Sequence, residues 1–175
     1  MKIISELAKA EGGFLESALP VIAFVTLTTL MQFSQAKWDN SFALWIRDLQ
    51  AHNQRTLGWI KAQENTPQRH AHVALVGAGP LDCHHAEKLW QAIAAPRYAD
   101  AAVVKPYKLG RGGLGYILKE LGIAQEDAQF SPNLSAFAPH SSSQFYGRNP
   151  AERRQQARIK EQLKRQRAEQ HLLVG

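Results

Sequence analysis

The chain has 175 residues, of which 45% are hydrophobic, so it can form one domain with a buried core and leaves little room for a second. Its formal net charge is +6 and its pI about 9.6. Residues 151–175 hold seven Lys or Arg and three Glu, so +4 of that charge lies there and the rest of the chain is only mildly basic. The net charge alone therefore does not indicate a nucleic-acid-binding protein.

The single cysteine, Cys83, excludes an intrachain disulfide and favours a reducing compartment, so the expected location is the cytoplasm. The first 20 residues mix Glu and Lys with apolar residues, unlike a secretory leader. The longest apolar run, Ala18–Leu27, is too short to span a bilayer. No membrane partner is expected.

Residues 2–18 place apolar side chains at helical spacing and are interrupted by Gly12-Gly13, which predicts one or two short helices covering a sheet face. Val21–Thr29 follows Pro20, is rich in β-branched residues and alternates along its length. This pattern predicts a strand.

Lys37–Arg55 returns to helical periodicity, with Asp39 or Asn40 available as its cap, and its tryptophans are expected in the core. Leu57–Glu64 has the period of a strand, and polar residues 65–69 predict a turn into the strand that begins at His70. These two strands are expected to form a hairpin.

The remaining elements are a helix, a strand, a glycine-rich turn and a short helix, expected at Cys83–Ala95, Ala101–Tyr107, Gly110–Gly113 and Leu114–Leu121. From Val21 onward the order is strand, helix, strand, strand, helix, strand, helix. This order predicts an α+β fold, with a central antiparallel sheet of split βαββαβ order, as in ferredoxin-like and RRM-like domains, and helices packed on one face.

The expected domain organisation has three parts. Residues 1–122 form the core with its N-terminal helical segment. Residues 123–150 are rich in Ser, Pro, Asn and Gln and form an irregular segment that returns to the core at its aromatic residues. Residues 151–175 form a basic tail that is helical or disordered.

His70 and His72 are separated by one small residue at the start of a predicted strand. Side chains alternate along a strand, so both imidazoles are expected on one face and within reach of one ion. A carboxylate on the neighbouring strand, Glu64, would complete a ligand set for Mg or Mn. A shift of one residue in register would present Gln63 instead.

Tyr116 and Lys119 are three residues apart on the predicted short helix, so the phenol and the ammonium are expected to share a face. A tyrosine attacks a phosphate as its phenolate or while its proton is removed, and a neighbouring cation assists that step. Taken alone, this pair is common. Its combination with the histidine pair and the strand before them is more specific.

In these three motifs the chain resembles the HUH endonuclease superfamily, in the branch of single-tyrosine rolling-circle replication initiator (Rep) proteins. The resemblance covers residues 21–121, and its motifs are Phe24–Thr29, His70-Ala71-His72 and Tyr116-Ile117-Leu118-Lys119. It implies an antiparallel sheet flanked by helices. It also implies that His70, His72 and Glu64 bind a divalent cation, Mg or Mn, that Tyr116 is the nucleophile, and that Lys119 assists.

The function implied by the resemblance is sequence-specific nicking and rejoining of single-stranded DNA through a 5′-phosphotyrosine, which initiates rolling-circle replication of a plasmid or phage. Position 120 is Glu rather than a second tyrosine, which argues against the two-tyrosine branch. The sequence contains no Walker motif, so unwinding of the origin DNA requires a separate host helicase.

Four basic residues near the motifs are candidate contacts to the single-stranded or locally melted origin DNA: Arg69, Lys105, Lys108 and Arg111. Two alternative functions remain open. One is a single-tyrosine DNA transposase with the same histidine pair, and the other is a non-catalytic nucleic-acid-binding module of the same fold.

Overall fold

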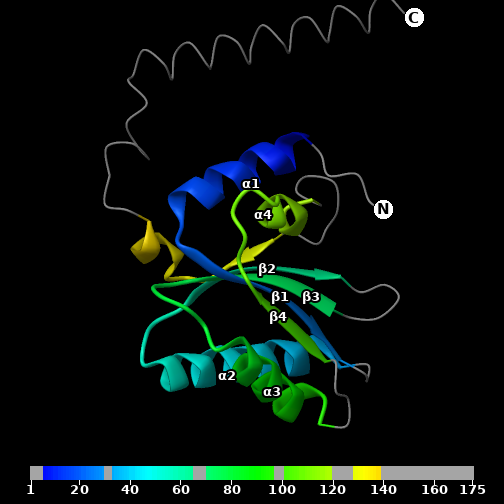
Figure 1. Ribbon diagram of the computed structural model, residues 1–175. Helices are drawn as coiled ribbons and strands as arrows, with labels where there is room; N and C mark the ends of the chain where they lie inside the picture. The colour runs from blue at the N-terminus through cyan, green and yellow to red at the C-terminus, as the bar shows by residue number, and fades with distance from the viewer. Residues whose placement is uncertain (1–5, 30–32, 65–69, 97–100, 120–127, 139–175) are drawn as a thin grey trace, which may run out of the picture. The chain divides into compact units, whose positions relative to one another are not determined.

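The computed structural model describes residues 6–29, 33–64, 70–96, 101–119 and 128–138. They form an α+β fold in which a five-stranded antiparallel sheet is flanked by helices (Figure 1). The strand order is β4-β1-β3-β2-β5. In sequence the strands are β1 (Val21–Thr28), β2 (Gly58–Glu64), β3 (His70–Val76), β4 (Ala102–Pro106) and β5 (Gln129–Phe130).

The centre of the sheet is the pairing of β1 with β3. Thr26 lies opposite His72 and Thr28 opposite His70. On the other side of β3, Glu64 at the end of β2 lies opposite His70. The expected hairpin of β2 and β3 is thus present, and its register brings Glu64 beside the histidine pair.

Helices cover both faces of the sheet, whereas the sequence predicted helices on one face only (Figure 1). Helices α2 (Gln35–Asn53) and α3 (Cys83–Ala94) cover one face, and α1 (Glu6–Ala18) and α4 (Gly113–Ile117) cover the other. The second layer forms because β2 and β3 carry apolar side chains on this face too, including Ile60 and Ala74, which are fully buried.

The face covered by α2 and α3 holds the larger core, in which Trp38, Trp45 and Trp90 are fully buried. The predicted core role of the α2 tryptophans is confirmed. The indole of Trp45 donates a 2.9 Å hydrogen bond to the Ala86 carbonyl, which ties α2 to α3. Helix α2 begins earlier than predicted, because Ser34 caps it by accepting a hydrogen bond from the Lys37 backbone N–H.

Helix α1 runs without a break through Gly12-Gly13, so the interruption predicted there is wrong. The two glycines differ in their surroundings. A Cβ on Gly12 would lie 2.3 Å from the backbone nitrogen of Gly115, whereas a Cβ on Gly13 would meet nothing within 4 Å. Gly12 is therefore the contact point at which α1 and α4 approach each other.

Strand β5 was not predicted. It is only two residues long and pairs with β2, with Phe130 opposite Ile60. The short 3-10 helix η1 (Leu134–Phe137) follows, and Leu134 and Phe137 pack against the smaller core. Phe130 stays 46% exposed, so only part of the expected return to the core is seen. Residues 139–150 and the tail at 151–175 lie outside the described residues.

All described residues belong to the compact unit Met1–Ala138. Within the described ranges, no helix has the length and apolar character needed to cross a bilayer.

Candidate metal and tyrosine site

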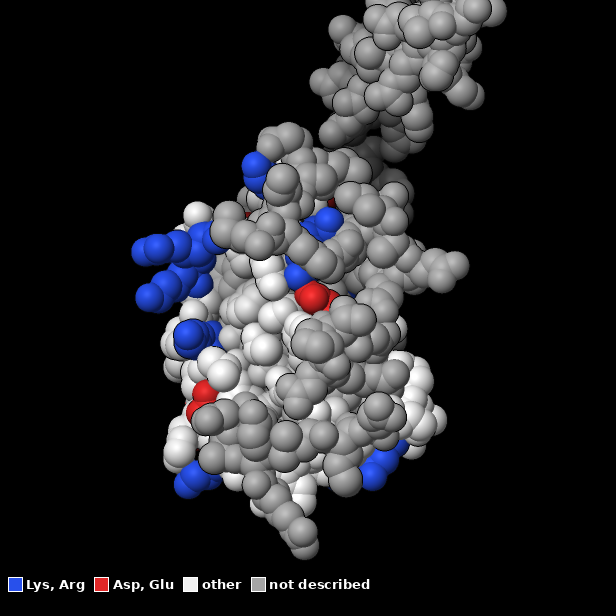
Figure 2. Space-filling view, turned by 90° about the vertical axis from the view of Figure 1, so that its right-hand side faces the viewer, with Lys and Arg blue, Asp and Glu red and all other residues white. Residues whose placement is uncertain are grey.

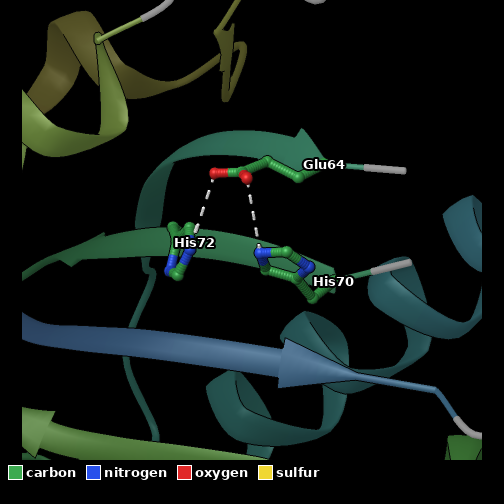
Figure 3. A group of neighbouring side chains, drawn as sticks. All are labelled: Glu64, His70 and His72. Carbon is green, nitrogen blue, oxygen red and sulfur yellow. Dashed lines mark ion pairs between the residues drawn. The ribbon is translucent and has the colours of Figure 1, made fainter. Parts of the chain in front are cut away.

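Glu64, His70 and His72 meet at one end of the sheet, on the face covered by α1 and α4 (Figure 3). The pairing of β2 with β3 explains this directly. Glu64 lies opposite His70, and His72 follows two residues along β3, so all three side chains leave the sheet on the same side.

The ligand atoms of these three residues converge. Glu64 Oε2 lies 3.6 Å from His70 Nε2, and Glu64 Oε1 lies 3.8 Å from His72 Nε2. All three ligand atoms lie within 4.8 Å of one another. Neighbouring ligands of an octahedral ion with bonds of about 2.1 Å are about 3 Å apart, so these atoms would have to move closer together to bind Mg²⁺ or Mn²⁺.

The choice between Glu64 and Gln63 is decided by the register. Gln63 points to the opposite face of β2, where its amide exchanges hydrogen bonds of 3.1 and 3.2 Å with Gln35 of α2. Of the two candidates, Glu64 is the residue that joins the histidines.

His72 is held by its neighbours on β1. Its Nδ1 lies 3.2 Å from the Thr26 hydroxyl, so Nε2 is the nitrogen that faces Glu64. The ring stacks on Phe24, with centroids 5.9 Å apart. Burial, together with the positive charge of His70, lowers the pKa of His72 to about 4. His72 is therefore neutral at pH 7, as a metal ligand must be.

Glu64 also forms a close ion pair with Lys119, whose Nζ donates to Oε1. Burial alone would raise the pKa of Glu64, but the hydrogen bond and charge of Lys119, with smaller effects from His70 and His72, hold it below its usual value. Glu64 is therefore ionised at neutral pH and can act as an anionic ligand.

Tyr116 lies beside this group. Its ring is 4.9 Å from the His72 ring, in an edge-to-face arrangement, and Lys119 Nζ lies 3.8 Å from the Tyr116 ring centroid. The expected proximity of Tyr116 and Lys119 is confirmed. Helix α4 is shorter than predicted and ends at Ile117, but the Lys119 backbone N–H bonds to the Tyr116 carbonyl and keeps the turn tight.

A cleft with a volume of about 550 Å³ opens next to Tyr116 and His72. Three of the four basic candidates, Lys105, Lys108 and Arg111, line it. In Figure 2, the largest groups of Lys and Arg side chains lie along the left edge, others lie near the centre and at the lower right, and acidic groups are few among the described residues in view. The fourth candidate, Arg69, lies outside the described residues.

A second tyrosine in the cleft, Tyr107, was missed by the sequence analysis. Its hydroxyl donates to the Glu16 carboxylate of α1 and accepts a 3.2 Å hydrogen bond from the Leu114 backbone N–H. Burial and the bond to Glu16 raise the pKa of Tyr107 well above its usual value. Tyr107 is thus a poor nucleophile that ties α1 to α4. Glu16 lies 91 residues away in sequence, so no local pattern indicated this contact.

No protein-family model and no curated protein matches the chain. Among solved structures it is similar to the hypothetical protein ORF119 from Sulfolobus islandicus rod-shaped virus 1, with 14% sequence identity and a TM-score of 0.47. The match covers 67% of this chain and 97% of that one. A similarity this distant carries no argument about function, which therefore rests on the site.

Proposed function

We propose that this protein is a metal-dependent HUH-type DNA endonuclease and strand transferase that initiates rolling-circle replication of a plasmid or phage. The observation that carries the proposal is the position of Tyr116, with its ring 4.9 Å from His72, beside a cluster of two histidines and a carboxylate. The order β4-β1-β3-β2, which is that of a ferredoxin-like split βαββαβ sheet, supports the proposed fold family.

His70, His72 and Glu64 are the residues that would hold the divalent cation. When bound, such an ion polarises the scissile phosphate and offsets the charge that develops on its oxygens. The protein residues do the rest. Thr26 fixes the ring of His72, and Lys119, placed between Glu64 and Tyr116, stabilises the phenolate.

The reaction is a transesterification. The Tyr116 oxygen forms a bond to phosphorus, and the bond from phosphorus to the 3′ oxygen breaks. The phenol loses its proton, and the leaving 3′ oxygen gains a proton to become a free 3′-hydroxyl. The 5′ end stays linked to Tyr116. The 3′-hydroxyl can prime synthesis, or attack the phosphotyrosine and restore the strand.

The cleft supports a single-stranded substrate. Lys105, Lys108 and Arg111 supply positive charge for the backbone, and Phe24 offers an aromatic edge beside Tyr116, with ring centroids 6.5 Å apart. Duplex origin DNA must be melted first, so a separate host helicase and a cytoplasmic site of action belong to the proposal.

The test is incubation of the full chain with Mn²⁺ and a library of single-stranded oligonucleotides, followed by a denaturing gel. We expect a covalent adduct with the wild type and none with Tyr116→Phe. Tyr107→Phe is the matched control, because its hydroxyl is engaged with Glu16 and it should still form adduct.

Absence of any adduct with the wild type across the library would overturn the nuclease proposal and favour a non-catalytic binding module. Adduct formation by Tyr116→Phe would overturn the assignment of the nucleophile. Paired cleavage of two DNA ends by a stable dimer would favour a transposase.

A further inference from the structure

A second cavity, of about 400 Å³, lies on the other face of the sheet, between α2 and the edge formed by β2 and β5. Its lining includes Asp39 and Phe42 of α2, Trp59 and Lys61 of β2, and Gln129 of β5. Lys61 and Trp59 alternate with Ile60, so they point away from the metal and tyrosine site. We call this space the Lys61 cavity.

Lys61 is unusual because only 2% of it is exposed. Lysine is almost never fully buried unless it is well paired. Its amino group has three hydrogens to donate. Among the described residues it makes one long hydrogen bond, of 3.4 Å, to Asp39 Oδ1. Burial lowers the pKa of Lys61 despite the opposing charge of Asp39. The amino group thus retains donor capacity at the wall of a cavity.

The surroundings of Lys61 are aromatic. Its Nζ lies 4.6 Å from the Phe42 ring centroid and 5.8 Å from that of Trp59. The two rings meet edge to face, with centroids 5.1 Å apart. Trp59 is only partly buried, so the protein does not fully enclose it.

Asp39 places an acceptor next to this donor. Gln35 donates 3.1 Å hydrogen bonds to both of its carboxylate oxygens, which fixes its orientation. The carboxylate keeps further acceptor capacity, and about half of the side chain is exposed. A donor and an acceptor therefore stand side by side at the edge of an aromatic cavity.

The charges around the cavity are balanced. Lys61 is matched by Asp39, and Arg47 at the rim is paired with Asp48 at 2.7 Å. A simple anion would gain from Lys61 and lose against Asp39. A planar ring with neighbouring acceptor and donor atoms would satisfy both groups and stack on the aromatic side chains.

We propose that the Lys61 cavity binds a nucleobase, with Lys61 Nζ donating to an acceptor on the pairing edge of the base and Asp39 accepting from the adjacent N–H. Every nucleobase carries such an acceptor and donor side by side on its pairing edge. The volume lies within the range of small-molecule sites, and stacking on Trp59 adds affinity. This inference does not depend on the proposed nicking activity, because it involves the opposite face of the sheet.

The test uses the full chain and nucleosides, which carry no phosphate: thymidine, deoxyguanosine, deoxycytidine and deoxyadenosine. Trp38, Trp45 and Trp90 are fully buried, so quenching of tryptophan fluorescence reports Trp59. We expect saturable quenching by at least one nucleoside at a Kd on the order of 1 mM or tighter, confirmed by calorimetry. Inorganic phosphate should neither quench nor compete.

Lys61→Met removes the amino group, keeps an unbranched chain that reaches as far as Cε and suits a buried position, so it should fold at least as well as the wild type. We expect it to weaken nucleoside binding by about tenfold or more, and Asp39→Asn to weaken it by a similar factor. Tyr116→Phe should bind nucleosides like the wild type, so a failure of the nicking proposal remains distinct. No saturable quenching up to about 10 mM, equal binding by Lys61→Met, or Lys61-dependent binding of phosphate would each overturn the proposal.

Discussion

The two faces of the sheet use the same strands for different purposes. On the face covered by α2 and α3, the large core packs three fully buried tryptophans. The indole N–H of Trp45 in α2 donates to the Ala86 carbonyl, and that of Trp90 in α3 donates to the Thr28 carbonyl. On the face covered by α1 and α4, the end of the same sheet carries two histidines and a glutamate (Figure 3). A tyrosine and a lysine, Tyr116 and Lys119, lie beside them.

This contrast shows how a small domain can combine stability with a polar site. The tryptophan core stabilises the sheet through apolar burial, so the other face can hold Lys119 and His72 buried and Glu64 partly buried at some cost. Changes in the tryptophan core should therefore lower the free energy of unfolding, whereas changes at the polar site should also alter metal binding and chemistry.

The largest effect on stability is expected from Trp45→Ala. The side chain is fully buried and its indole donates to the Ala86 carbonyl. We expect the free energy of unfolding, measured by urea denaturation, to fall by about 3–5 kcal/mol. The neighbouring Leu44 is 40% exposed, so Leu44→Ala should change it by no more than about 0.5 kcal/mol. Similar losses for both variants would contradict the assignment of this core.

Acid should destabilise the polar face. The His72 pKa is about 4 in the folded protein and near 6.5 when the chain is unfolded, so protonation favours the unfolded state. In EDTA, the contribution of neutral His72 to the free energy of unfolding should be fully present above pH 6.5. It should fall by about 3 kcal/mol as the pH is lowered to 4. His72→Asn should lose that part of the pH dependence, and an unchanged profile would count against the burial of His72.

Removal of one ligand should weaken metal binding. His70→Ala takes one of three converging ligand atoms away, and we expect the affinity for Mn²⁺, measured by calorimetry, to fall by about 100-fold or more. His85→Ala is the matched control, because His85 lies on α3 and stacks on His52. Equal affinity of the two variants would exclude the proposed ligand set.

The smallest effects concern the contact between α1 and α4. Gly12→Ala places a methyl group against the Gly115 backbone and should cost roughly 1–3 kcal/mol in the free energy of unfolding. Gly13→Ala meets no atoms and should stabilise helix α1 by up to about 1 kcal/mol. In thermal melts, Tm should fall for Gly12→Ala and rise for Gly13→Ala. Shifts in Tm of the same sign would contradict this contact.

Much of this architecture follows from periodicity. Strand β1, the pairing of β2 with β3 and the ends of α3 could be predicted, because alternation and capping residues are local signals. Strand β5 has two residues and no period to detect. Glycines inside a helical pattern indicate a break by local rules, so the sequence predicts an interruption of α1 at Gly12-Gly13. Those rules cannot show that the Gly115 backbone lies against Gly12.

The site shows the same division. The histidine pair could be recognised from spacing alone, but the expectation of Glu64 rather than its register alternative Gln63 depended on the pairing of β2 with β3. Tyr107 depends on Glu16, and Lys61 depends on the packing of α2 over β2. Such contacts join distant parts of the chain and leave no pattern in the sequence around either partner.

The central proposal, that Tyr116 is the residue that attacks DNA, is tested most directly by mass spectrometry of the protease-digested covalent adduct. We predict a 5′-phosphorylated nucleotide fragment attached to the peptide that contains Tyr116. Attachment at Tyr107 or at any other residue, or the absence of an attached fragment, would contradict the account.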